Sequence, residues 1–320
     1  MNSRWPEFGS VSTLTPREVA PQRTLAVRAA DGTRLHTEIY GPPGGYPIVL
    51  AHGFTCATGV WRDQIADLAA EYRVIAYDQR GHGRSGIPPR RNYSLSYLAS
   101  DLDAVLEATL APRETALIAG HSMGGMAVMA WSDRYRHKVG QRVDAVALLN
   151  TTNGDLLRQV NLLPVPRQLS AARVLAARQL VNTFGSFDMP NAFGRPTRTF
   201  VRMLAVGAQA DPAVAALVYE LFTATSAAGR GGCAKMLATG VGSRHISLTG
   251  LTVPTLVIGS HRDRLTPISQ SRRIARSLPH CVGLVELPGG HCAMLEQPRR
   301  VNRELRSLAE SVVGARRISS

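Results

Sequence analysis

The sequence has few cysteines, and none of them lies in a metal-binding or disulfide-rich pattern. The four cysteines form no C-x-x-C pair and show no zinc-like spacing, so they predict neither a disulfide framework nor a structural metal site. A chain of 320 residues buries enough surface to hold its core without such links. We therefore expect a reducing compartment, and a cytoplasmic location, for this protein.

The sequence also lacks long apolar runs. Its apolar segments have the length of strands, far short of the roughly 20 residues that a membrane-spanning helix needs. The N-terminal segment has no apolar stretch of the kind found in secretory signals. We therefore expect no membrane span and no secretory signal, while peripheral contact with lipid stays open.

Lysine is nearly absent, although the chain is basic. The 37 basic residues outnumber 23 acidic ones and give a formal net charge of +14, yet Lys138 and Lys235 are the only lysines. The arginines are scattered as single residues and isolated doublets, and no recognition helix, zinc finger or RNA-binding signature accompanies them. This distribution favours a basic, solvated surface and no nucleic-acid partner. An acidic partner and the oligomeric state stay open.

Short β-rich runs alternate with longer helical patterns along much of the chain. This alternation predicts an α/β fold with a mostly parallel sheet covered by helices on both faces. Strands are expected at residues 24–29, 35–40, 47–51, 74–77, 116–119, 143–149, 255–258 and 283–287. Helices are expected at about 59–70, 94–110, 124–138, 267–278 and 292–313. A turn signal at Asp31-Gly32 predicts that an antiparallel hairpin opens the sheet.

Strand signals disappear between residues 153 and 245, where several prolines divide the chain into short helical patterns. This predicts a helical cap or lid inserted into an α/β core of residues 23–152 and 246–320, after a disordered or extended arm of residues 1–22. Five of the seven phenylalanines lie in the insertion. They either form its own core or line an apolar substrate pocket beneath it: Phe184, Phe187, Phe193, Phe200 and Phe222.

The strongest chemical signal is Gly120-His-Ser122-Met-Gly124, which directly follows a predicted strand and opens a predicted helix. A serine hydroxyl is a poor nucleophile, so it must stand on a turn tight enough to present it to a base. The glycines on either side relieve the crowding of that turn. We therefore predict that Ser122 is a catalytic nucleophile.

A base and an acid can be found downstream of Ser122. His291 follows the last predicted strand in a glycine-rich loop, and Asp263 follows the strand before it. Loops at the carboxyl edge of a parallel sheet converge on one site. The order serine, acid, histidine is the one expected on this architecture. We expect His291 to be the base and Asp263 the acid that orients it.

Three other residues compete for these roles with less support. His121 adjoins Ser122 and so points away from it, whereas His261 reads as loop surface. Asp155 follows the sixth predicted strand, but it reads as the N-terminal residue of an inserted helix.

An oxyanion hole is the third requirement of this chemistry. We expect its two backbone N–H donors to come from Met123, which follows the nucleophile, and from Phe54 in the loop His52-Gly53-Phe54-Thr55. His52 is read as a structural residue of this loop at the edge of the substrate pocket. The run Gly81–Gly86 fits a dinucleotide-binding pattern, but the prolines after it block the helix that such a site needs. We read it as a structural turn and expect no cofactor and no catalytic metal.

At this point the sequence resembles the α/β-hydrolase superfamily. The resemblance covers roughly residues 24–152 and 246–313 and rests on five motifs: His52-Gly-Phe54, residues 78–85, residues 120–125, Asp263 and Gly290-His291. It implies an eight-stranded sheet with an antiparallel second strand, a helical cap after the sixth strand, and no cofactor.

The residue at the elbow narrows the expected chemistry. Epoxide hydrolases and haloalkane dehalogenases of this fold carry an aspartate where this chain has Ser122, so those activities are disfavoured. The leading hypothesis is a serine esterase or lipase that cleaves a small carboxylic ester with an apolar acyl or alcohol part. Carbon–carbon bond hydrolysis, haloperoxidase-like activity and ligand binding without catalysis stay open. An anionic substrate would suit Arg195, Arg198 and Arg202.

Overall fold

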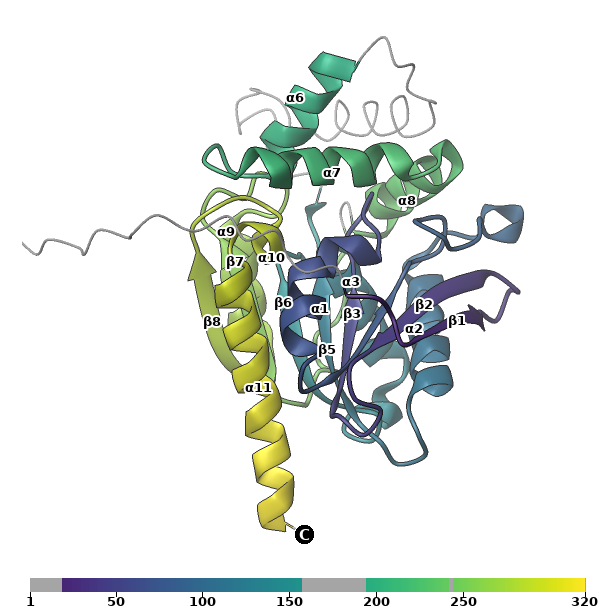
Figure 1. The fold of residues 1–320 in the computed structure, drawn as a ribbon, viewed down its shortest axis with the longest axis vertical. Helices are drawn as coiled ribbons and strands as arrows, with labels where there is room; N and C mark the ends of the chain where they lie inside the picture. The colour runs from purple at the N-terminus through teal and green to yellow at the C-terminus, as the bar shows by residue number, and fades with distance from the viewer. Residues whose placement is uncertain (1–18, 157–193, 242–243, 320) are drawn as a thin grey trace, which may run out of the picture.

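A computed structural model describes residues 19–156, 194–241 and 244–319 of the chain (Figure 1). Eight strands form one sheet in the order β1-β2-β4-β3-β5-β6-β7-β8. Their bounds are β1 Arg23–Arg28, β2 Arg34–Tyr40, β3 Pro47–Ala51, β4 Arg73–Tyr77, β5 Ala116–His121, β6 Val143–Leu149, β7 Thr255–Ser260 and β8 Cys281–Leu287. Strand β2 pairs antiparallel with both β1 and β4, and the later strands are parallel. The predicted fold is confirmed.

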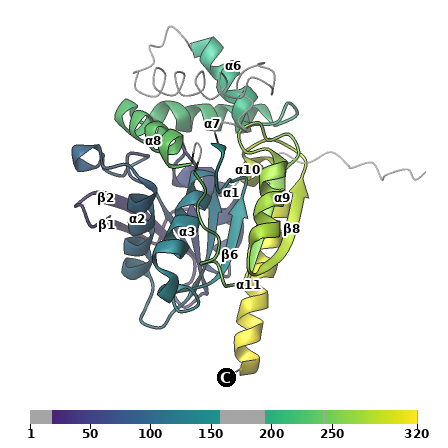
Figure 2. The same ribbon diagram turned by 180° about the vertical axis from the view of Figure 1, so that it is seen from behind.

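Helices cover both faces of this sheet (Figures 1 and 2). One face carries α2 Leu95–Thr109, α3 Met123–Arg134 and α9 Ile268–Ser277. The other carries α1 Arg62–Leu68, α10 Ala293–Glu296 and α11 Pro298–Ser319. Three short 3-10 helices connect these elements: η1 Thr58–Trp61, η2 Pro89–Arg91 and η3 Arg136–Lys138. The central strands β3 to β7 are largely buried because both helical layers pack apolar side chains onto them, whereas the edge strand β1 is mostly exposed.

Two of the predicted helices are divided in the structure. Residues 59–70 form η1 followed by α1, and residues 292–313 fall into α10 and α11 with a break at Gln297. Proline at 298 explains the second break, because it has no N–H to donate into the preceding turn and suits the first position of a new helix. The predicted helix 124–138 ends earlier, at Arg134.

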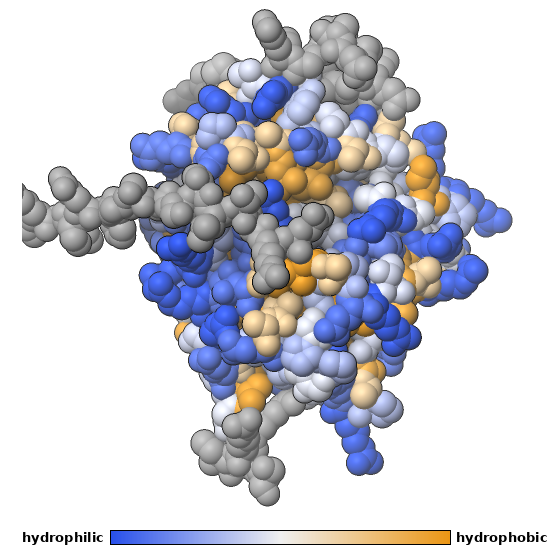
Figure 3. Space-filling view, viewed as in Figure 1, coloured by the Kyte–Doolittle hydropathy of each residue, from blue (hydrophilic) through white to orange (hydrophobic). Residues whose placement is uncertain are grey.

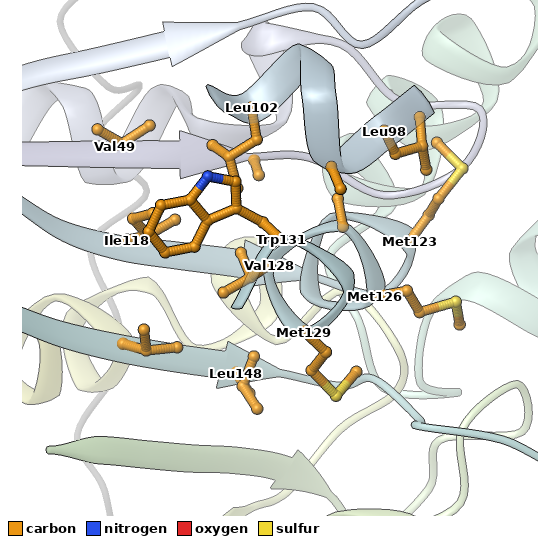
Figure 4. Packing of buried hydrophobic residues seen from close by; sticks show 14 of the residues in the cluster. Val49, Leu98, Leu102, Ile118, Met123, Met126, Val128, Met129, Trp131 and Leu148 are labelled. Atoms are coloured by element: carbon orange, nitrogen blue, oxygen red, sulfur yellow. The ribbon is translucent and has the colours of Figure 1, made fainter. Parts of the chain in front are cut away.

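Helix α3 links the core to the predicted nucleophile. Its residues Met123, Met126 and Met129 pack with Val49 of β3 and Leu148 of β6 in one buried cluster (Figure 4). The helix directly continues β5, so this packing fixes the turn between them. Burial of these apolar side chains away from water is the main interaction that holds the turn in place.

The segment between β6 and β7 contains three described helices, α6 Gly194–Ala205, α7 Pro212–Ala224 and α8 Ala227–Gly240. They lie above the carboxyl edge of the sheet (Figures 1 and 2). The chain leaves and re-enters the sheet side by side, because Gly154 bridges to His245 and the Ile246 N–H donates to the Asn153 carbonyl at 2.6 Å. We call α6, α7 and α8 the inserted helices.

The surface agrees with the scattered charge of the sequence. Hydrophilic side chains cover most of the face in Figure 3, and apolar ones gather in its upper middle, around α7. None of the helices in the described ranges has the length and apolar composition to cross a bilayer.

The run that resembles a dinucleotide-binding pattern is a structural turn, buried at Gly81 and His82. The Arg80 guanidinium donates to both carboxylate oxygens of Asp101 at 2.6 Å and to Asp31 at 2.9 Å. Gly81 has a φ of +75°, and a side chain there would overlap Tyr93 and Gly229 of α8. The glycine therefore permits a turn that supports the inserted helices.

Replacement of Arg80 should destabilise the fold strongly. Arg80→Met leaves the Asp101 carboxylate, which is 2% exposed, without its counter-charge, and we expect the free energy of unfolding to fall by about 3 kcal/mol or more. Arg136→Met removes an exposed ion pair with Asp133 and should change it by less than about 1 kcal/mol. Urea denaturation of both variants measures the difference, and equal losses would contradict this account.

Candidate active site

Ser122 lies at a sharp turn between β5 and α3. Its backbone has φ +51° and ψ −115°, a region that residues other than glycine rarely occupy. Its N–H donates to the Leu149 carbonyl at 3.0 Å, and its carbonyl accepts from the Thr151 hydroxyl at 2.7 Å and from the Met126 N–H at 3.1 Å. Bonds on both sides of the residue therefore hold it in this strained conformation.

The glycines around the turn are required because neighbouring atoms leave no space for a side chain. A side chain at Gly124 would overlap the carbonyl oxygen of Ala51. A Cβ atom at Gly120 would lie 2.8 Å from the Cα atom of Gly125, and one at Gly125 would lie 2.8 Å from the Thr151 side chain. The turn can pass this close to β3 and β6 because these positions carry no side chain.

The structure brings Asp263 and His291 together. Asp263 Oδ2 lies 2.8 Å from His291 Nδ1, and the two side chains are 0% and 7% exposed. They stand in the loops after β7 and β8, which are neighbouring strands. The two side chains thus meet at the carboxyl edge of the sheet, where the sequence predicted an acid and a base.

The Asp263 carboxylate is surrounded by further donors. Its Oδ1 accepts from the Leu265 and Thr266 N–H groups, each at 2.8 Å, and its Oδ2 accepts from the Thr266 hydroxyl at 2.7 Å and the Asn150 amide at 2.9 Å. Burial alone would raise the pKa of Asp263, but the nearby His291 and the Thr266 hydrogen bonds outweigh it and hold this pKa below its usual range. The acid is therefore ionised at neutral pH.

His121 connects the serine turn to the base loop. Its ring centroid lies 4.7 Å from that of His291, and its Nε2 lies 3.0 Å from the His291 carbonyl oxygen. Ser122 Oγ itself makes no hydrogen bond within the described part of the chain. Serine and base thus stand on touching loops, an arrangement that commonly tightens only when substrate binds.

The loop after β3 lies against the serine turn. A Cβ atom on Gly53 would lie 3.2 Å from Ser122 Cβ, which places the next residue, Phe54, beside the nucleophile. Neither the Phe54 nor the Met123 backbone N–H donates to an acceptor among the described residues. The two donors expected for the oxyanion hole are therefore near Ser122 and unused.

His52 is a structural residue of this loop. It is fully buried, with Nδ1 2.7 Å from the Gly53 carbonyl oxygen and Nε2 accepting the Gln79 N–H at 2.9 Å. Burial lowers the pKa of His52 to about 4. Because both ring nitrogens bind the backbone and the side chain is 0% exposed, His52 does not line an open pocket, contrary to our expectation for this side chain.

The rival residues are engaged elsewhere. His261 is exposed and lies 3.5 Å from Glu286. Asp155 binds Arg273 of α9 at 3.3 Å and His245 at 3.2 Å, so it closes the neck through which the inserted helices join the sheet.

The aromatic residues predicted for the pocket are only partly described. Phe200 on α6 is 41% exposed, and Phe222 on α7 packs against the buried cluster beneath it. Phe184, Phe187 and Phe193 lie outside the described residues.

Sequence reasoning missed Glu296, which joins the base loop to the inserted helices. Its carboxylate accepts the N–H groups of Gly290 and Gly207, each at 2.9 Å. The Cys292 N–H donates to the Ala205 carbonyl at 3.1 Å. The end of α6 is thereby fixed against the loop that carries His291. No local sequence signal marks this contact, because Gly207 and Glu296 are 89 residues apart.

Comparison with known proteins agrees with the fold. The sequence model of a family described as alpha/beta hydrolase fold matches residues 46–298. The chain belongs to the α/β-hydrolase fold family. Within the described residues of this family member, no group of three or more His, Cys, Asp and Glu side chains is placed to hold a metal ion.

Relatives of this α/β-hydrolase differ in their named activities. A putative carbamate hydrolase, RutD of Variovorax paradoxus, is 31% identical over 275 residues, which is 85% of this chain and 94% of that protein. A thermophilic esterase from Thermogutta terrifontis is 25% identical, with a TM-score of 0.68 over 92% of this chain and 99% of that one. Est816, an N-acyl homoserine lactone degrading enzyme, is 27% identical, with a TM-score of 0.68 over 88% and 99% of the two chains.

Acid should destabilise the folded protein through its buried histidines. Burial lowers the pKa of His52 to about 4, of His82 to about 3 and of His121 well below its usual range. In the unfolded chain these histidines bind protons near pH 6.5, whereas in the folded protein the three rings stay neutral at that pH. Their contribution to the free energy of unfolding is therefore fully present above pH 6.5 and is lost as the pH falls below it. The three groups together give a loss of about 4 kcal/mol per pH unit between pH 6 and 5.

Urea denaturation between pH 7 and 5 measures this slope. His82→Gln should reduce it by about one third, or about 1.4 kcal/mol per pH unit. His137→Gln, which replaces an exposed histidine, should leave it unchanged. An unaltered slope in His82→Gln would show that His82 is not held neutral in the fold.

Proposed function

We propose that this α/β-hydrolase is a serine hydrolase that cleaves carboxylic esters with an apolar acyl or alcohol part. The observation that carries the proposal is the 2.8 Å contact between Asp263 and His291, on the same sheet edge as the strained Ser122 turn. The similar structures include a thermophilic esterase and an enzyme that degrades N-acyl homoserine lactones, whose substrates contain a cyclic ester, and both support the proposal.

In this reaction Ser122 Oγ attacks the ester carbonyl carbon while His291 Nε2 takes the hydroxyl proton. The carbon–oxygen bond to the alcohol breaks, and the alcohol leaves with that proton. Water then attacks the acyl-enzyme, gives one proton to His291, and releases the carboxylic acid as Ser122 recovers its hydrogen. Every proton that His291 accepts is returned within the cycle.

Asp263 and the two backbone amides serve the charged stages of this cycle. The ionised Asp263 fixes the proton on His291 Nδ1, which leaves Nε2 free to act as base, and it stabilises the imidazolium. The N–H groups of Phe54 and Met123 bind the oxyanion that forms on the carbonyl oxygen. Because they belong to the main chain, they are oriented before the reaction starts.

A carbamate is the second candidate substrate. The relative from Variovorax paradoxus is named a putative carbamate hydrolase, and a carbamate carbonyl is open to the same attack by Ser122. The alternatives of carbon–carbon bond hydrolysis and haloperoxidase-like activity would use the same three residues. The arginines that would suit an anionic substrate give them little support, because Arg198 and Arg202 are exposed on α6. The side chain of Arg195 lies outside the described residues.

Hydrolysis of p-nitrophenyl esters from acetate to palmitate tests the proposal. We expect one chain length to be preferred and expect Ser122→Ala to lower turnover by about 10⁴-fold or more. Asp263→Asn should cost a similar factor because it stabilises the wrong tautomer of His291. Ser311→Ala, on α11 and bound only to its own helix, is the matched control and should retain full turnover.

Parallel assays separate the alternatives. Faster cleavage of a p-nitrophenyl carbamate than of every ester would replace the ester proposal with the carbamate one, and faster cleavage of a dienoate would favour carbon–carbon hydrolysis. If a fluorophosphonate failed to label Ser122 in the folded protein, the chain would be a ligand-binding member of the fold.

A further inference from the structure

The side chain of Asn150 stands between the predicted acid and the predicted base. Asn150 follows β6, and its amide nitrogen donates to Asp263 Oδ2 at 2.9 Å and to the Gly290 carbonyl at 3.4 Å. Asp263 Oδ2 is also the oxygen that contacts His291. One side-chain amide thus touches both the acid and the loop of the base.

A hydrogen bond and burial fix the backbone of Asn150. Its N–H donates to the Ile258 carbonyl of β7 at 2.8 Å, and its φ is +43°, a conformation that asparagine tolerates better than most residues. The residue is 0% exposed. Neither its backbone nor its side chain can turn without breaking a buried hydrogen bond.

The orientation of the Asn150 amide leaves its oxygen without a hydrogen-bond donor in the described part of the chain. Asn150 Oδ1 is buried and has no hydrogen-bond partner among the described residues. A buried acceptor without a donor destabilises a fold, so such a group needs an explanation. The reversed orientation would place this oxygen against the Asp263 carboxylate, which is electrostatically worse. The negative charge of Asp263 therefore determines which way the amide faces.

Asn150 differs from the other donors to this carboxylate in its origin. The backbone N–H groups of Leu265 and Thr266 and the Thr266 hydroxyl all belong to the turn that carries the acid. The Asn150 amide comes from the end of another strand. It joins the ends of β6, β7 and β8, which bear Asn150, Asp263 and His291 respectively.

We propose that Asn150 is a positioning residue for the acid–base pair: its amide holds the orientation of the Asp263 carboxylate and sets how strongly Oδ2 binds His291. This inference rests on the function proposed above. A neutral donor on Oδ2 draws electron density that would otherwise strengthen the bond to His291 Nδ1–H. Without it, the carboxylate binds the imidazolium more tightly, and His291 gives up its proton less readily.

The other titratable groups near His291 should not obscure the effect of Asn150 on the pH profile. His121 packs on its ring from β5 and is kept neutral by burial. Burial raises the pKa of Cys292, the residue after His291, well above its usual range and raises the pKa of Cys56 to about 12. Glu296 of α10 is bound to the Gly290 N–H, and the exposed Arg262 donates to Gln209. Asp263 is the charged group in direct contact with the ring.

The test is the pH dependence of kcat/KM for the best p-nitrophenyl ester. Asn150→Gly removes the amide and suits the positive φ, and Asn150→Leu keeps the volume without the donor. We expect the acidic limb of the profile to move up by about half a pH unit or more in both variants, with kcat/KM at neutral pH lowered about tenfold. Asn153→Ala removes a nearby amide that binds Ile246 and should leave the acidic limb in place.

A second readout keeps the test independent of turnover. The proton between His291 Nδ1 and Asp263 should give a strongly deshielded NMR resonance, and its shift should change in Asn150→Gly and Asn150→Leu but not in Asn153→Ala. Folded variants with the wild-type acidic limb and an unchanged resonance would overturn the role of Asn150. If the Asn150 variants behave in this way but Ser122→Ala is inactive, the proposed function still stands. If Ser122→Ala is active, the proposed function itself is overturned.

Discussion

The close passage of the β5–α3 turn along the ends of β3 and β6 governs the geometry of the site. The main chain at Gly124 runs directly against the Ala51 carbonyl, and Gly125 against Thr151. This contact requires the absence of side chains, forces Ser122 into a left-handed backbone conformation, and brings the loop of Phe54 beside it. Each further element of the site is placed relative to this crossing: the base loop touches His121, and the acid touches Asn150 at the end of the neighbouring strand.

Charge at the site is concentrated in one buried carboxylate. His52, His82 and His121 are kept neutral by burial. They serve as uncharged hydrogen-bonding groups that brace loops. Asp263, by contrast, is stabilised as an anion by donors on both oxygens. His291 therefore meets a negative charge at Nδ1, which is what the proposed role as a base at Nε2 requires.

Much of the fold could be predicted from the sequence because its signals are local. The strands β3 to β7 are largely buried, mostly apolar runs, and each of the eight strands lies within two residues of its expected bounds. The serine turn is marked by Gly120 and Gly124. The proximity of Asp263 and His291 could be predicted because each lies a few residues after a strand, and parallel strands end at one edge.

The remaining contacts could not be predicted because they join distant segments. Asn150 also follows a strand, but an asparagine in that position looks like an ordinary turn residue until its amide is seen on Asp263. Glu296 binds the backbone of Gly207, and nothing in either segment points to the other. The break at Pro298 is visible in the sequence, yet the apolar pattern continues through it, and the pattern alone predicted one helix. His52 resembled a residue at a pocket edge because burial cannot be judged from its loop sequence.

The contact of Glu296 with the backbone of Gly207 and Gly290 has a consequence for how this protein can evolve. Its carboxylate binds the main chain at Gly207 and Gly290, and side chains are excluded there because a Cβ atom at Gly207 would lie 2.8 Å from that carboxylate. The attachment of α6 to the base loop therefore does not depend on which residues the inserted helices display. Those helices can accumulate substitutions while their attachment to the loop of His291 stays unchanged, and under the proposed function such substitutions would alter substrate preference. A small set of three residues would thus separate the evolution of recognition from that of catalysis within one chain.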